Sequence, residues 1–166
     1  MKRTAVYSGT FDPITNGHLD VLKKASKQFD EVILAVAKAT GKKTLFSDEE
    51  RLALCEKVTE NISNVNVKIF DGLTVEFCKK EKASVMIRGL RAVSDFEYEL
   101  QLALMNKKLD QNLDTIFFIP EHNYLYLSSS MVREIIRLGG KLDEFVPEYV
   151  YNALLKKYNN GENYAE

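Results

Sequence analysis

The first residues whose types and spacing suit chemistry form the segment SGTFDPITNGH, residues 8–18. Gly9 lets the backbone approach a ligand closely, and a helix that begins near residue 18 offers free N–H groups and its positive dipole end to an anion. His18 would fall in the first helical turn, where its ring could donate a hydrogen bond to a phosphoryl oxygen as negative charge builds there. The segment matches neither G-x-G-x-x-G nor G-x-x-x-x-G-K-[ST], so we interpret it as a phosphate-binding loop of another kind.

Other residues of this segment have both a functional and a purely structural interpretation. Thr10 and Phe11 could offer backbone N–H groups to a phosphate, with the threonine hydroxyl as a further donor. They could equally belong to a simple tight turn. Asp12, which precedes a proline, suits turn formation better than chemistry and is not assigned as a base. In contrast with His18, His122 is framed by no motif and is interpreted as loop surface.

Charged side chains follow later strands. Arg88 and Arg91 come directly after a predicted buried strand and bracket a glycine. Two guanidinium groups there could clamp phosphates, although surface arginines in ordinary ion pairs are common. Glu99, on the next predicted helix, could orient one arginine or hydrogen-bond a ribose. Lys42 and Lys43 lie in a predicted loop, and residue chemistry alone neither chooses between them nor excludes solvated surface lysines.

Three consecutive serines at residues 128–130 open a predicted helix with hydroxyls and free N–H groups, which makes a second candidate anion site. A plain N-cap would need only one serine. No group of His, Cys, Asp and Glu has metal-ligand spacing, and no nucleophile is paired with a base as in hydrolases. A site rich in phosphate donors but poor in nucleophiles favours direct phosphoryl or nucleotidyl transfer, which depends mainly on positioning and charge stabilisation.

These side chains need a scaffold in which strand ends meet, and the hydrophobic pattern predicts one. Apolar or alternating runs predict strands at 5–7, 31–37, 65–70, 84–87 and 115–120. Helical spacing, with Ser47 and Ser94 as N-caps, predicts helices at 19–25, 48–60, 73–82, 95–109, 128–138 and 147–158. This alternation predicts an α/β, Rossmann-like, doubly wound and mostly parallel sheet with helices on both faces. Ligands bind at the carboxyl ends of such strands, where segments 9–16, 38–46, 70–74, 88–94 and 120–130 would meet.

Composition limits the class of protein. At 166 residues and a net charge of −1, we expect a single domain over residues 1–158, a polar tail over 159–166 and no general binding to nucleic acid. The two cysteines, Cys55 and Cys78, lack C-x-x-C spacing and are expected to be buried thiols. Because no signal peptide or membrane-spanning run is found, we expect a cytoplasmic protein that does not bind membranes.

The motifs also resemble those of a known family. Gly9-Thr10-Phe11-Asp12-Pro13 followed by Gly17-His18 resembles the T/H-x-x-H-type signature of the nucleotidyltransferase superfamily, which is related to the catalytic core of class I aminoacyl-tRNA synthetases. Arg88-Gly89-Leu90-Arg91 and the serines at 128–130 resemble the bacterial phosphopantetheine adenylyltransferases, over about residues 3–158. This resemblance implies a coenzyme A biosynthetic enzyme that reversibly transfers the adenylyl group of ATP to 4′-phosphopantetheine. The products would be dephospho-CoA and pyrophosphate, formed by direct in-line attack without a covalent enzyme intermediate.

The resemblance implies roles for individual residues. The catalytic groups would be His18, Lys42, Arg88 and Arg91, with His18 stabilising the transition state. The residues implied to bind ATP are Thr10, Phe11, His18, Gly89, Leu90, Arg91, Glu99, Tyr124, Leu125, Tyr126, Leu127, Ser128, Ser129 and Ser130. Those implied to bind phosphopantetheine are Thr10, Lys42, Leu73, Thr74 and Arg88.

The resemblance also implies a cofactor and partners. The family uses Mg²⁺, bound largely through the ATP phosphates, which suits a sequence without a carboxylate cage. It forms homohexamers, and coenzyme A is implied as a feedback inhibitor. The predicted helix 95–109 is apolar around more than one face, which indicates either deep burial or a subunit interface. Departures are modest: Ser8 stands where relatives often have proline, and Leu127 and Met131 replace similar apolar residues.

Two rival functions stay open at this point. A related enzyme acting on nicotinate mononucleotide or glycerol phosphate is disfavoured only by the resemblance of residues 88–91 and 95–99. A non-catalytic sensor that binds ATP or coenzyme A would be favoured by the loss of His18 or an arginine, and all of these are present.

Overall fold

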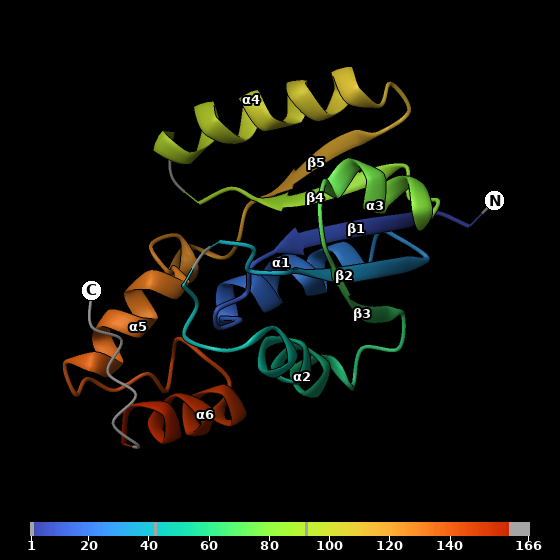
Figure 1. Cartoon of the computed structure of the whole chain (residues 1–166). Coiled ribbons are helices and arrows are strands. Elements are labelled where there is room, and N and C mark those ends of the chain that lie inside the picture. Colours follow the sequence, from blue (N-terminus) through green and yellow to red (C-terminus); the bar gives the residue numbers. More distant parts are fainter. Residues whose placement is uncertain (1, 42, 92, 160–166) are drawn as a thin grey trace.

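The computed structural model describes residues 2–41, 43–91 and 93–159 and shows a parallel β-sheet flanked by helices (Figure 1). Its strands are β1 (Thr4–Gly9), β2 (Glu31–Ala37), β3 (Val65–Phe70), β4 (Val85–Gly89) and β5 (Asp114–Phe118). They lie in the order β3-β2-β1-β4-β5, and every pairing is parallel. The predicted α/β, doubly wound architecture is confirmed.

The strand order reverses beside β1. The chain winds outward from β1 through β2 to β3, then returns to place β4 and β5 on the other side of β1. Tyr7 pairs with Ile87, so the carboxyl ends of β1 and β4, at Gly9 and Gly89, are neighbours. Because the connections leave these two ends in opposite directions, a crevice forms between them, and this is where open α/β sheets bind ligands.

Helices cover both faces of the sheet. They are α1 (Asn16–Ser26), α2 (Asp48–Thr59), α3 (Thr74–Lys80), α4 (Val93–Leu109), α5 (Ser129–Arg137) and α6 (Glu148–Asn159), with a short 3₁₀ helix, η1 (His122–Tyr124), that was not predicted. One hydrophobic core joins α1, α2, α5 and α6 to the sheet, and a second lies on the opposite face under α3. On that second face, Asn106 of α4 lies 3.5 Å from the sulfur of Met86. Burial on both faces explains the unbroken apolar run in β2.

Helix caps decide where several elements begin. Ser47 is the N-cap of α2 as predicted: its hydroxyl accepts from the Glu50 N–H at 3.2 Å, and the Glu50 carboxylate accepts from the Ser47 N–H at 2.8 Å. The prediction of Ser94 as an N-cap is wrong, because α4 begins at Val93 and Ser94 is already inside the helix. A Ser-x-x-Glu spacing also occurs within helices, where positions i and i+3 share a face, so the pattern alone does not fix the first residue.

Two other predictions concern the chemistry of the chain as a whole. Cys55 and Cys78 are buried free thiols, and burial raises the pKa of both to about 12, as expected for unreactive core cysteines. Within the described ranges, no helix combines the length and the apolar character needed to cross a membrane. Apart from Asn159, which ends α6, the predicted polar tail lies outside the described residues.

Candidate active site

A cavity of about 470 Å³ opens where the strand order reverses. Its walls come from the loop after β1, the start of α1, the end of β4 and the start of α5. The predicted site residues that line it are Thr10, Phe11, His18, Arg88, Gly89, Arg91, Glu99, Leu127, Ser129 and Ser130. The fold therefore brings together most of the residues predicted to hold a nucleotide.

His18 is fixed by the cap of its own helix. It is the third residue of α1, and the backbone N–H of Thr15, the N-cap, donates to its Nδ1 at 3.0 Å. In return, the Thr15 hydroxyl accepts from the His18 N–H at 3.3 Å. Burial, assisted by the positive charges of Arg91 and Arg88, lowers the pKa of His18 to about 3. The imidazole is therefore neutral near pH 7, and its proton lies on Nε2 because Nδ1 is an acceptor.

The aromatic ring of Phe11 packs against the imidazole ring of His18. Its centroid lies 5.2 Å from that of His18 and 5.5 Å from that of Tyr7, edge-on to both. A Cβ on Gly9 would lie 2.9 Å from this ring, so Gly9 provides space for Phe11, a packing role that the sequence pattern does not reveal. Burial raises the pKa of Tyr7 above its usual range, so its hydroxyl stays protonated and is no candidate for a base.

Arg88 forms a two-pronged ion pair with Glu99. Its Nε and Nη2 donate to the two carboxylate oxygens at 2.8 and 2.7 Å, and its Nη1 donates to the carbonyl of Ser8 at 2.9 Å. Burial alone would lower the pKa of Arg88, but the hydrogen bonds and charge of Glu99 raise it. Glu99, itself buried, therefore orients one arginine, the first of its two predicted roles.

A second cavity of about 240 Å³ adjoins the first. It lies between the start of α3, with Leu73 and Thr74, and α4, with Ala103 and Asn106. Ser8, Arg88 and Glu99 line both cavities. The Arg88 guanidinium consequently stands at the boundary between two neighbouring spaces, where it could contact a ligand in either one.

The start of α5 is tied to the other loops of the site. Ser128 is the plain N-cap, and its hydroxyl accepts from the Met131 N–H at 3.1 Å. The Ser129 hydroxyl donates to the carbonyl of Pro13 at 2.8 Å. Arg91 reaches this segment from the end of β4 and donates to the Leu127 carbonyl at 2.6 Å. Two serine hydroxyls are thus used within the protein, which leaves mainly the N–H groups at the helix start for an anion.

Several predicted residues do not line either cavity. They are Leu90, Tyr124, Leu125, Tyr126 and Ser128. Leu90 instead donates its backbone N–H to the carbonyl of Phe118 at 3.0 Å. Lys42 lies outside the described residues, whereas its neighbours Lys43 and Thr44 line the first cavity. Contacts of the first five with ATP, and of Lys42 with phosphopantetheine, stay predictions.

Arg133 lines the first cavity but was not predicted as a site residue. Its Nη2 donates to the Ser130 hydroxyl at 3.2 Å, and its Nη1 donates to the Asp12 carbonyl and lies 3.5 Å from the Asp12 carboxylate. The sequence feature that could have predicted this role is the spacing of three residues between Ser130 and Arg133, which places both side chains on one side of a helix. Arg133 adds a fourth cationic side chain to Lys43, Arg88 and Arg91 around this cavity.

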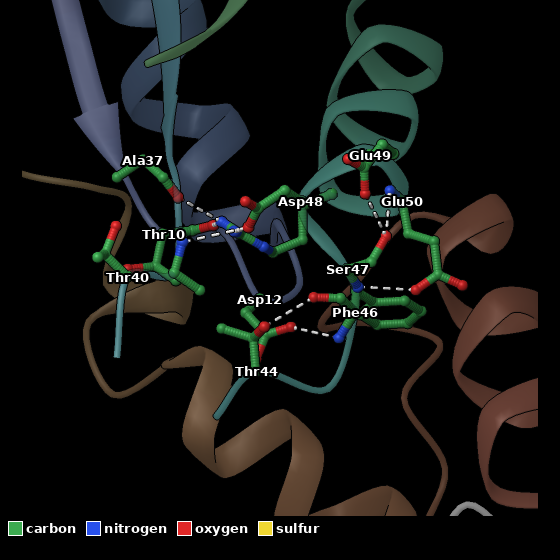
Figure 2. Close-up of polar contacts among 12 residues, drawn as sticks. Thr10, Asp12, Ala37, Thr40, Thr44, Phe46, Ser47, Asp48, Glu49 and Glu50 are labelled. Atoms are coloured by element: carbon green, nitrogen blue, oxygen red, sulfur yellow. Dashed lines mark hydrogen bonds and ion pairs between the residues drawn. The ribbon is translucent and has the colours of Figure 1, made fainter. Parts of the chain in front are cut away.

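Asp12 connects the loop after β1 to the segment that precedes α2. Its carboxylate accepts from the backbone N–H groups of Leu45 and Phe46, each at 2.9 Å, and Figure 2 shows it facing Phe46. Asp12 is only 5% exposed, and both of its carboxylate oxygens accept backbone N–H groups, so it is no free base. The sequence did not indicate which groups Asp12 would bind. By holding the backbone of Leu45 and Phe46, its carboxylate fixes the preceding residues Lys43 and Thr44 in the cavity wall.

Comparisons with known proteins show what the whole chain is similar to. Residues 6–135 match the family described as Cytidylyltransferase-like. The chain is 53% identical over 157 residues to the phosphopantetheine adenylyltransferase of Desulfitobacterium hafniense (strain Y51), covering 95% of this chain and 96% of the relative. It is 52% identical over 155 residues to the phosphopantetheine adenylyltransferase of Clostridium novyi (strain NT), with coverages of 93% and 96%.

Solved structures share the fold at low sequence identity. The nicotinic acid mononucleotide adenylyltransferase of Plasmodium falciparum, complexed with NaAD, superposes with a TM-score of 0.72 at 17% identity, over 96% of this chain and 97% of that one. The lipopolysaccharide core biosynthesis protein of Thermoplasma volcanium GSS1 superposes with a TM-score of 0.54 at 22% identity, over 73% and 98%. Sequence identities of 17% and 22% show a shared fold alone. Relatives that are about half identical over nearly their whole length show the family. The chain belongs to the phosphopantetheine adenylyltransferase family of nucleotidyltransferases.

Proposed function

We propose that the chain reversibly transfers the adenylyl group of ATP to 4′-phosphopantetheine, giving dephospho-coenzyme A and pyrophosphate in coenzyme A biosynthesis. The observation that carries this proposal is the pair of adjoining cavities that share Ser8, Arg88 and Glu99. The larger, cation-lined cavity suits a nucleoside triphosphate. The smaller one suits the long arm of an acceptor whose phosphate reaches the shared arginine.

On the nucleotide side, donors surround the place where phosphates would lie. The N–H groups at the start of α5 and the guanidinium groups of Arg91 and Arg133 would hold the β- and γ-phosphates. The Nε2–H of His18 would donate to the α-phosphoryl oxygen as charge accumulates there. Leu90 and residues 124–128 would complete the ATP site, as the family resemblance implies.

On the acceptor side, Arg88 would bind the phosphate of 4′-phosphopantetheine together with Thr10 and Lys42. The pantetheine arm would extend past Leu73 and Thr74 into the second cavity, where the amide of Asn106 offers a hydrogen-bonding partner. Held this way, the attacking phosphate oxygen and the α-phosphorus of ATP meet at the junction of the two cavities.

The reaction would be a direct in-line displacement. A phosphate monoester is already ionised near neutral pH, so no side chain has to remove a proton from it. The site instead must overcome the repulsion between two anions, and Arg88, Arg91, Lys42 and His18 supply the positive charge and hydrogen bonds for this. A neutral His18 with its proton on Nε2 cannot attack phosphorus itself, because that nitrogen has no free lone pair.

Mg²⁺ would enter with ATP. Among residues 2–41, 43–91 and 93–159, no three His, Cys, Asp or Glu side chains are grouped as metal ligands, and the acidic residues of the cavity, Asp12 and Glu99, are engaged by backbone N–H groups and Arg88. The donor set thus fits a metal held by phosphate oxygens and water. When bound, Mg²⁺ would neutralise part of the triphosphate charge.

The wider biology of the chain is proposed on the same basis. The exposed apolar side chains of α4, among them Tyr98, Leu104 and Met105, favour a subunit interface over deep burial and support a homohexamer. Coenzyme A, which contains the same pantetheine arm and adenylate as the product, would compete for both cavities as a feedback inhibitor. The reaction would take place in the cytoplasm.

Pyrophosphate release tests the proposal. The chain is incubated with ATP and Mg²⁺ alone, with 4′-phosphopantetheine, and with nicotinate mononucleotide as a parallel acceptor. We expect release only with 4′-phosphopantetheine. Release with nicotinate mononucleotide instead would overturn the acceptor, and no release despite measurable ATP binding would favour a nucleotide sensor.

A further inference from the structure

Arg51 is a charged side chain buried without any exposed surface, directly behind the phosphate loop. It lies in the first turn and a half of α2 and is 0% exposed. A guanidinium removed from water is costly unless it is paired and hydrogen-bonded. An apolar side chain of similar size would fill this space with a smaller loss of solvation free energy. The groups that the Arg51 N–H donors bind therefore indicate the role of the arginine.

The donors of Arg51 are directed at backbone carbonyls that border the site. Its Nη1 donates to the carbonyl of Thr10, just beyond β1, and at 2.8 Å to that of Ala37, at the end of β2. Its Nη2 is paired with the carboxylate of Asp48. Figure 2 shows Thr10, Ala37 and Asp48 gathered at this point. The Nε of Arg51 is buried without a hydrogen-bond partner. The guanidinium thus binds the two carbonyls although one of its own N–H groups stays unbonded.

The bond to Thr10 determines where the next N–H points. The peptide between Thr10 and Phe11 is trans, so its carbonyl and its N–H lie on opposite sides. When Arg51 holds the carbonyl on the side of α2, the Phe11 N–H lies on the opposite side of this peptide, and both Thr10 and Phe11 line the cavity. No hydrogen bond within the described part of the chain uses this N–H.

The loop would not keep this orientation unaided. Phe11 has a φ of 50°, a left-handed conformation that costs free energy for a residue with a side chain. A flip of the Thr10–Phe11 peptide would relieve it and turn the N–H away from the cavity. Two contacts oppose this flip. The ring of Phe11 packs edge-on against Tyr7 and His18, and the carbonyl of Thr10 accepts a hydrogen bond from Arg51.

We propose that Arg51 is a positioning residue for adenylyl transfer: it holds the Thr10 carbonyl so that the Phe11 N–H is presented to the phosphates of ATP. The positive charge behind the carbonyl also polarises this peptide and makes its N–H a stronger donor. The inference rests on the proposed function of the same cavity, but its first test needs no catalysis.

The Phe11 amide reports on the proposal directly. The chain holds nine phenylalanines, so ¹⁵N-phenylalanine labelling gives a sparse spectrum, in which Phe11 is assigned by its loss in Phe11→Tyr. Inorganic pyrophosphate is titrated into the wild-type chain and Arg51→Met. We expect a saturable downfield shift of the Phe11 amide proton in the wild-type chain, and in Arg51→Met a lost shift with roughly 10- to 100-fold weaker pyrophosphate binding.

A matched control separates positioning from stability. Leu54→Ala removes a buried side chain of the same helix without touching the Thr10 carbonyl. It should be destabilised yet keep the Phe11 shift and the wild-type affinity for pyrophosphate. In turnover, Arg51→Met should lower kcat and weaken ATP binding more than it raises the KM for 4′-phosphopantetheine. Of the proposed acceptor contacts only Thr10 borders this peptide, and the second cavity does not involve it.

Arg51→Lys covers the case in which Arg51→Met does not fold. It keeps the charge but lacks the fork that reaches two carbonyls, so it should fold and still lose most of the Phe11 shift. A wild-type Phe11 amide that ignores pyrophosphate, or an unchanged shift in either Arg51 variant, would contradict the positioning role. A wild-type chain that shows the shift but releases no pyrophosphate from ATP would overturn the proposed function and leave the role of Arg51 in anion binding standing.

Discussion

The backbone N–H of Thr15 donates to Nδ1 of His18 at 3.0 Å. This single hydrogen bond makes the capping residue of α1 the residue that sets the tautomer of the histidine. With Nδ1 as acceptor and the pKa lowered to about 3, the ring is neutral and presents Nε2–H. His18 is therefore placed to stabilise charge by donating a hydrogen bond, rather than to exchange a proton with the substrate.

His18→Ala should abolish most turnover and leave ATP binding nearly intact. Loss of one preorganised donor to a developing oxyanion lowers kcat by roughly 100- to 1,000-fold. The Kd for ATP should change by less than about threefold, because the bond strengthens only in the transition state. Steady-state kinetics and calorimetric titration measure the two. His122→Ala, at the other histidine of the chain, is the control and should match the wild type; near-wild-type turnover in His18→Ala would refute the assigned role.

The low pKa of His18 makes a prediction about pH. The unfolded chain binds a proton to this histidine near pH 6.5 and the folded chain only near 3. Its contribution to stability is therefore complete above about pH 6.5 and is lost as pH falls towards 3. Thermal unfolding at about pH 7.5 and pH 5 should show a larger acid-induced decrease in the wild type than in His18→Gln. Equal decreases would mean that His18 titrates normally in the folded chain.

Asp12→Asn should loosen the segment before α2. An amide cannot accept from both the Leu45 and Phe46 N–H groups without turning its own NH₂ towards one of them. We expect a loss of about 2 kcal/mol in the free energy of unfolding and faster hydrogen exchange at both amides. Asp30→Asn is the control, because in the described part of the chain its exposed carboxylate accepts one hydrogen bond, from the Arg3 N–H at 2.7 Å, with the Arg3 Nε 3.9 Å away. Unchanged exchange at Leu45 and Phe46 would argue against Asp12 as the anchor.

Arg88→Met should be destabilising as well as inactive. It leaves the buried carboxylate of Glu99 without its two hydrogen bonds, at a cost of about 2 kcal/mol. Adding Glu99→Gln to this variant should recover part of the loss, because an amide is less costly to bury than an unpaired carboxylate. Chemical denaturation of both single variants and the double variant measures the coupling. Strictly additive losses would show that the ion pair contributes nothing to stability.

The second cavity can be blocked without touching the first. Ala103 lines only the smaller space, and Ala103→Phe would fill part of its roughly 240 Å³. We expect the KM for 4′-phosphopantetheine to rise at least about tenfold, the affinity lost when an arm of several methylene groups is excluded, with an ATP Kd close to that of the wild type. A raised ATP Kd with an unchanged acceptor KM would reverse the assignment of the two cavities.

The sequence predicted those parts of the molecule that depend on local patterns. The strands 31–37 and 65–70 have the predicted bounds, and the cap at Ser47 was correct, because periodicity and capping act over a few residues. Arg88 was predicted to follow a strand over 84–87, whereas β4 extends to Gly89 and includes it. Its place at the carboxyl end of a strand, like that of His18 in the first turn of a helix, still follows from local patterns.

Contacts between distant segments could not be predicted in this way. Arg51 sits among the acidic residues that open α2 and has the local appearance of a surface arginine, yet it is buried because β1 and β2 end beside it. Asp12 looks like a turn residue, and its partners are more than thirty positions away. Neither local propensity nor motif spacing predicts contacts between residues so far apart in the chain.

The stereochemistry at the α-phosphorus tests the central claim most directly. The wild-type chain is given ATP with a chiral α-phosphorothioate, Mg²⁺ and 4′-phosphopantetheine, and the configuration of the dephospho-coenzyme A product is determined. Direct attack in a site that only positions and neutralises its substrates predicts inversion. Retention would contradict this account, because it would require two displacements and an adenylyl group carried by the protein.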